Sequence, residues 1–137
     1  MSEKAPSADR WLREAKADPS APACGMYLFH NGVVRGTARA AVRQGRADTA
    51  PVAGMVFDYD DDLVRQAVED ARRLPGIGYV RVWLNRGELT LGDDIMMVLI
   101  GGDIRPHVVD ALQRLVGTLK DRCVTEREVF SPGADTP

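Results

Sequence analysis

The chain has 137 residues, 45% of them hydrophobic and 28% charged, which is typical of one globular domain and leaves too little sequence for two separate cores. Its 18 basic and 20 acidic side chains give a formal net charge of −2, which excludes a polycationic nucleic-acid binder. The longest apolar run, residues 95–100, is far shorter than the roughly 20 residues that a membrane helix needs. The first residues lack the apolar core of a signal peptide, so we expect a cytoplasmic protein.

Short runs of strand-forming residues alternate with longer helical repeats along the chain. In chain order they predict a helix at residues 7–18, a strand at 25–30 that Val33 and Val34 extend, a strand at 52–58, a helix at 60–74, strands at 79–84, 88–91 and 95–100, a helix at 106–120 and an edge strand at 123–130. Hairpin-linked strands with two long helices favour an α+β fold with a mostly antiparallel sheet over a doubly wound parallel sheet.

We interpret residues 1–137 as a single domain with a core over about 7–130 and a disordered tail at 131–137. A basic stretch interrupts this core, because residues 33–46 contain no acidic side chain but four arginines, at positions 35, 39, 43 and 46. Their spacing fits one face of a short helix, whereas Gly36 and Gly45 favour a mobile, arginine-rich loop over 36–51, which we predict. This loop is either merely solvated or a flap that binds an anion.

Motifs of the common enzyme classes are absent from the sequence. There is no GxSxG, Walker or HExxH pattern, and neither His30 nor His107 has a nucleophile beside it. Cys24 and Cys123 stand 99 positions apart and indicate neither a zinc site nor a disulfide. The acidic run 60–62 is interpreted as a helix cap, since no other metal-ligand type accompanies it. We therefore expect no metal and no cofactor.

The remaining candidate chemistry is cationic. Basic side chains stand at a strand end, in the predicted loop, at a helix start and near the C-terminus; they include Arg35, Arg39, Arg105, Lys120 and Arg127. Guanidinium groups and helix N-termini hold phosphates and carboxylates through charge-assisted hydrogen bonds. The substrate class that these residues indicate is a small anion. Nucleic acid is a weaker interpretation, because the acidic stretch 58–62 and the lack of interleaved aromatic residues count against it.

Four segments of the chain resemble one known family in order and spacing. They are the strand Gly25 to His30 leading to Gly32-Val-Val-Arg35, the hairpin Gly87-Glu-Leu to Gly92-Asp-Asp-Ile95, Arg105 at a helix start, and Leu119-Lys120 at that helix's end. Together they cover about residues 24–130. The family is the large, catalytic subunit of molybdopterin synthase.

This resemblance implies an α/β-hammerhead fold, assembled as a homodimer with a small ubiquitin-like subunit at each end. The family transfers sulfur from a thiocarboxylate on the Gly-Gly tail of the small subunit to a cyclic pterin phosphate, in molybdenum cofactor biosynthesis. The resemblance also implies that Lys120 is the catalytic lysine and that Arg35 and Arg105, with Arg39 of the loop, bind the anionic pterin. Arg127 stands at the position of a second catalytic lysine.

The distance between two of these residues, and three positions that differ from the family's pattern, limit what the resemblance implies. Fifteen residues of helix between Arg105 and Lys120 span roughly 22 Å, so both can reach one small ligand only if two chains share the pocket. Ile104 replaces a family histidine, and Glu126 replaces a tryptophan beside a pocket for an anion, which costs affinity unless it pairs with an arginine. Arg127 keeps the charge of the lysine it replaces but cannot lose a proton near neutral pH. A non-catalytic paralogue that binds a pterin or a Gly-Gly tail is the alternative.

Overall fold

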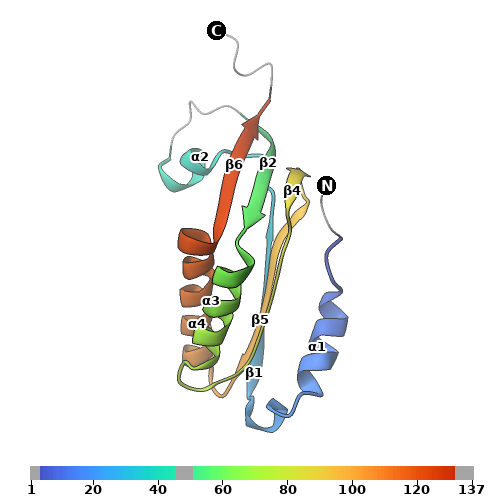
Figure 1. Ribbon diagram of the computed structural model, residues 1–137, viewed down its shortest axis with the longest axis vertical. Helices are drawn as coiled ribbons and strands as arrows, with labels where there is room; N and C mark the ends of the chain where they lie inside the picture. The colour runs from blue at the N-terminus through green and yellow to red at the C-terminus, as the bar shows by residue number, and fades with distance from the viewer. Residues whose placement is uncertain (1–3, 46–50, 132–137) are drawn as a thin grey trace.

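The computed structural model, which describes residues 4–45 and 51–131, has two small antiparallel sheets and four α-helices (Figure 1). The helices are α1 Ala8–Lys16, α2 Arg39–Arg43, α3 Asp61–Arg72 and α4 Arg105–Thr118. The strands are β1 Met26–Val33, β2 Val52–Tyr59, β3 Ile77–Leu84, β4 Gly87–Thr90, β5 Asp94–Gly102 and β6 Val124–Phe130. A 3-10 turn, Ala21–Ala23, precedes β1, and a π-helical turn, Leu119–Cys123, joins α4 to β6.

The first sheet has the strand order β1-β5-β3 and carries the main core. Its central strand, β5, sends Val98 and Ile100 toward α3 and α4, while Met97 and Leu99 face α1 on the opposite side. Both faces of β5 are therefore covered, which explains why this segment is apolar at successive positions instead of alternating. Trp11 of α1 is only 3% exposed and completes the smaller of the two clusters.

The second sheet has the order β4-β2-β6, so β6 is an edge strand as expected. Arg86, between β3 and β4, links the two sheets: its guanidinium donates to the Tyr59 carbonyl oxygen at 2.9 Å and lies 4.1 Å from the centre of the Tyr59 ring. It also bonds the Asp58 carboxylate, and this hydrogen bond lowers the pKa of Asp58. These contacts attach the end of β2 to the segment between β3 and β4, where the chain passes from the first sheet to the second.

The α+β class, the antiparallel pairing and every long element predicted from the sequence are confirmed. Asp60 caps α3 by accepting a hydrogen bond from the Leu63 amide at 3.0 Å, as the capping interpretation requires. Both cysteines are free. Within the described ranges no cluster of metal-ligating side chains occurs, and no helix is long and apolar enough to cross a membrane.

One expectation about regular structure is wrong. Residues 39–43 of the predicted loop form the helix α2, because contacts from β6 hold it in place as described below. The helix predicted through about Lys120 is confirmed, because α4 continues after Thr118 into the π-helical turn, which contains Lys120. Residues 46–50 of the predicted loop and 132–137 of the predicted tail lie outside the described residues.

The turn between α3 and β3 depends on a glycine. Gly76 has φ +77°, and a Cβ at this position would collide with the Asp103 carboxylate and the His107 ring. These two side chains form a 2.7 Å contact at the start of α4, and the hydrogen bond to His107 lowers the pKa of Asp103. Gly76 therefore lets the turn pack against the start of α4.

We predict that Gly76→Ala lowers the free energy of unfolding by about 1–3 kcal/mol, the cost of holding a residue with a Cβ in the left-handed region. The matched control is Gly117→Ala in α4, where a Cβ meets no atom within 4 Å among the described residues. It should raise the free energy of unfolding by roughly 0.5–1 kcal/mol, because alanine loses less backbone freedom in a helix. Urea unfolding measures both, and equal effects would contradict the assignment.

Candidate functional site

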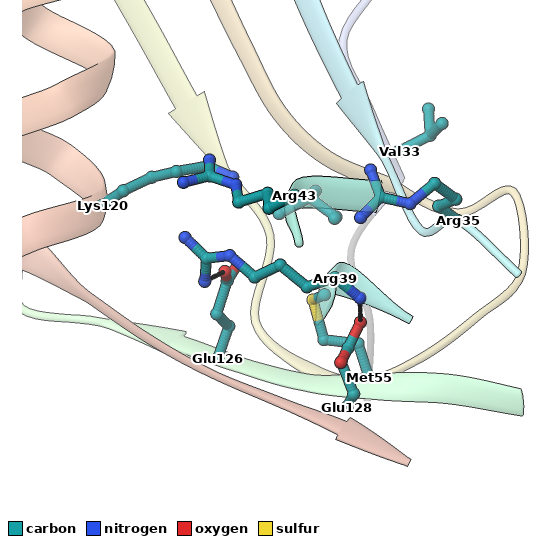
Figure 2. A pocket seen from close by; sticks show the side chains of 9 residues that line it. Val33, Arg35, Arg39, Arg43, Met55, Lys120, Glu126 and Glu128 are labelled. Carbon is teal, nitrogen blue, oxygen red and sulfur yellow. Dashed lines mark hydrogen bonds and ion pairs between the residues drawn. The ribbon is translucent and has the colours of Figure 1, made fainter. Parts of the chain in front are cut away.

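A pocket of about 210 Å³ opens where α2 lies over the junction of the two sheets. Its lining combines four cations, two carboxylates and three apolar side chains: Arg35, Arg39, Arg43, Lys120, Glu126, Glu128, Val33, Met55 and Ile95 (Figure 2). Both sheets, α2 and the π-helical turn contribute to it. The pocket thus collects most of the cationic residues that the sequence singles out.

Backbone periodicity explains how the charged side chains reach the pocket. Arg39 and Arg43 are four residues apart and share one side of α2. Glu126 and Glu128 alternate along β6 and share one face of the sheet, while Arg127 between them is exposed on the other face. Lys120 enters from the π-helical turn, a kind of distortion that is frequent at functional sites.

The two carboxylates of the pocket both contact Arg39. Its guanidinium Nη1 donates to Glu126 Oε1 at 2.8 Å, and its backbone N–H donates to Glu128 Oε2 at 2.9 Å. The cost that we expected from a carboxylate beside an anion pocket is therefore offset, because Glu126 pairs with an arginine. Among the residues that the structure describes, Lys120 and Arg43 have no carboxylate partner, so the pocket keeps an excess of positive charge.

His30 adds a titratable group near Lys120. It lies on β1 opposite Val98 and is half-buried. Burial lowers the pKa of the His30 imidazole below its ordinary value, and the positive charge of Lys120 lowers this pKa further. The imidazole is therefore held toward its neutral form beside the pocket, a property that sequence reasoning missed because no motif surrounds His30.

Two of the predicted site residues do not line this pocket. Arg105 is the first residue of α4, at the end of the helix away from Lys120. Arg127 lies on the exposed face of β6. Ile104, the residue before Arg105, is 52% exposed. One chain thus brings together Arg35, Arg39 and Lys120 but neither of the other two cations.

Glu128 was not among the predicted site residues, and Arg43 was predicted only as one of the loop arginines that could bind an anion. Arg43 follows Arg39 at helical spacing, so the pattern for placing it was present in the sequence. Glu128 follows Glu126 at strand spacing in a predicted strand, which is the signal that could have found it. Neither signal shows which face of its element meets the pocket, because that depends on contacts between distant segments.

The family model described as MoaE protein matches residues 2–122 of the chain. A search of curated proteins finds no match. Solved structures with a similar fold include a molybdopterin synthase from Staphylococcus aureus, with a TM-score of 0.70 at 13% identity over 93% of this chain and 88% of that one. The molybdopterin cofactor biosynthesis protein E from Burkholderia multivorans has a TM-score of 0.67 at 21% identity, over 93% and 86% of the two chains.

A third similar structure is a complex of subunits 1 and 2 of the molybdopterin-converting factor from Helicobacter pylori. Its TM-score is 0.62 at 13% identity, over 97% of this chain and 89% of that one. At these identities the structural matches establish the shared fold.

We predict that the pKa of His30 lies below 6.5 and rises in Lys120→Gln, while remaining below the ordinary value because burial is its larger cause. Since the folded-state pKa is lower than the unfolded one, the unfolded chain binds the proton first as the pH falls. The folded state with neutral His30 is therefore favoured above pH 6.5, and this contribution to the free energy of unfolding is lost as the pH falls through the folded-state pKa.

An NMR titration of the imidazole in the parent and in Lys120→Gln measures both values. Lys16→Gln, on α1, is the control for loss of an ammonium charge elsewhere. A His30 pKa that does not change in Lys120→Gln would show that the two side chains are not neighbours.

Proposed function

The chain belongs to the MoaE protein family, and we propose that it is the large, catalytic subunit of a molybdopterin synthase that acts in molybdenum cofactor biosynthesis. The observation that carries this proposal is the meeting of Arg35, Arg39, Arg43 and Lys120 in one pocket, from segments far apart in the sequence. The substrate is a cyclic pterin phosphate, whose anionic group suits guanidinium donors. The predicted cytoplasmic location stays a prediction.

Lys120 is the proposed catalytic residue. Among the described lining residues it supplies the pocket's amine, and an amine can exchange a proton or act as a nucleophile where a guanidinium cannot. Arg35, Arg39 and Arg43 hold the anionic groups. Arg127 keeps only a proposed electrostatic role, since its side chain lies on the far face of β6.

A small subunit with a Gly-Gly tail is the proposed sulfur donor. One similar structure is a complex of two subunits of a molybdopterin-converting factor, which supports a partner of this kind for the present chain. A tail without side chains suits a narrow pocket of about 210 Å³. The thiocarboxylate at its end carries the negative charge that the four cations favour.

A homodimer would complete the site. Arg105 begins α4 and Lys120 lies in the π-helical turn beyond its other end, roughly 22 Å away along the helix, so one chain presents only Lys120 to the pocket. A two-fold axis would bring Arg105 of the partner subunit to the pocket of the first chain. Ligand binding and oligomeric state are then linked.

The second candidate function is binding without turnover. It is favoured by the position of the family's second lysine, which is here Arg127 on the exposed face of β6. Lys120 is therefore the one amine among the described lining residues of the pocket. A subunit of this kind would bind a pterin or a Gly-Gly tail and release it unchanged.

We expect the purified chain, mixed with a thiocarboxylated small subunit and the cyclic pterin phosphate, to form a dithiolene product. Lys120→Arg should keep pterin affinity but slow product formation by at least about 100-fold, because it retains the charge and loses the exchangeable proton. Lys16→Arg is the matched control. A parent chain that binds the pterin in calorimetry yet forms no product would favour the non-catalytic candidate.

Complementation tests the shared pocket. Lys120→Ala and Arg105→Ala should each be inactive alone, whereas an equal mixture that exchanges subunits should regain about a quarter of parent activity. Half of the dimers are then mixed, and each mixed dimer has one intact site. Subunit exchange is checked with differently tagged chains. A mixture that exchanges and stays inactive would place Arg105 outside the site.

A further inference from the structure

The helix α2 is too short to be stable alone. It has five residues, whereas isolated helices shorter than about 12–15 residues are marginal in water. Its N-cap residue, Ala38, offers no side-chain acceptor, and Gly45 beyond its end has φ +66°. Apolar packing adds little, because Ala38 is buried but Val42 is 56% exposed. Other contacts must therefore hold α2 over the pocket.

Strand β6 supplies these contacts. Glu128 accepts the Arg39 backbone N–H at 2.9 Å and so replaces the missing N-cap, while Glu126 accepts from the Arg39 guanidinium at 2.8 Å. The pairing of β6 with β2, from Tyr59↔Val124 to Val52↔Phe130, fixes both carboxylates on a sheet. Figure 2 shows both bonds as links between β6 and the same arginine.

The geometry leaves Arg39 able to bind a ligand at the same time. A guanidinium has five N–H donors, and the bond to Glu126 uses one of them. The Glu126 side chain is 16% exposed against 43% for Arg39, so the arginine is the more accessible of the two to an incoming ligand. An anion entering the pocket meets Arg39 first. Glu126 therefore orients Arg39 and does not take the place of the ligand.

We propose that Glu126 and Glu128 are positioning residues that attach α2 to β6, so that Arg39 and Arg43 face an anionic substrate opposite Lys120. This inference rests on the proposed function for the identity of the substrate. The attachment itself depends only on the contacts of Arg39. The two carboxylates act through arginine, and neither needs to touch the ligand.

Hydrogen exchange tests the role of Glu128. In Glu128→Ala, the amides of residues 39–43 should exchange at least about tenfold faster, because a hydrogen bond to a charged acceptor is lost. Glu128→Gln retains an acceptor oxygen and should restore most of the protection. Glu69→Ala, which breaks the exposed ion pair with Arg72 on α3, is the matched control. Parent-like exchange in Glu128→Ala would overturn the attachment.

Inorganic phosphate tests the role of Glu126, with binding to the full chain measured by calorimetry. Glu126→Ala should weaken phosphate binding by roughly three- to tenfold because Arg39 loses its orienting partner, and Glu126→Gln should bind nearly as the parent does. If Glu126 instead competed with the ligand, both variants would bind phosphate more tightly. That result would overturn the proposal, as would equal weakening in both variants, which would show a need for charge and not for orientation.

These measurements separate this inference from the proposed function. Exchange and phosphate binding require neither the small subunit nor turnover. A parent chain that forms no dithiolene product while Glu128→Ala loosens α2 would refute the proposed function alone. A productive parent chain in which Glu126→Ala and Glu128→Ala match the control Glu69→Ala in both measurements would refute the positioning role alone.

Discussion

The pairing of β6 with β2 is the interaction on which the pocket depends. It joins the last strand to a strand from the middle of the chain, with Met55 opposite Glu128 and Phe57 opposite Glu126. This register turns both glutamates toward α2 and leaves Arg127 on the other face. A shift of one residue would exchange the faces and bring Arg127, a fourth arginine, to the pocket in place of the carboxylates that hold α2.

Elements whose stability comes from their own apolar pattern were predictable from the sequence. The repeat through Ala67 and Ala71 defines α3, and the run of apolar residues in β5 marks a strand covered on both sides. The helix α2 was not predictable in this way, because its five residues are held by Glu126 and Glu128. Local patterns report local preferences, and the flanking glycines favoured a loop where contacts with distant residues instead accompany a helix.

The candidate site was predictable in its chemistry more than in its geometry. An uncompensated group of basic residues indicated an anion, and the resemblance added the catalytic role of Lys120. Helix length already separated Arg105 from Lys120 in the sequence, but the meeting of Lys120 with Arg35 and Arg39 depends on contacts between segments far apart in the chain. The neutral tendency of His30 also arises from burial and from the charge of a distant residue, neither of which the neighbouring sequence encodes.

A pocket for an anion that contains two carboxylates is consistent once their partners are considered. The Arg39 guanidinium compensates the charge of Glu126, the Arg39 backbone N–H satisfies an oxygen of Glu128, and the Arg39 side chain stays 43% exposed. In the proposed positioning role, this ion pair would present its positive end to the ligand. In a partly dry pocket an oriented donor contributes more than a freely moving one, since its orientation is fixed before the ligand arrives. The fixed orientation of the Arg39 guanidinium thus compensates for the part of its positive charge that Glu126 neutralises.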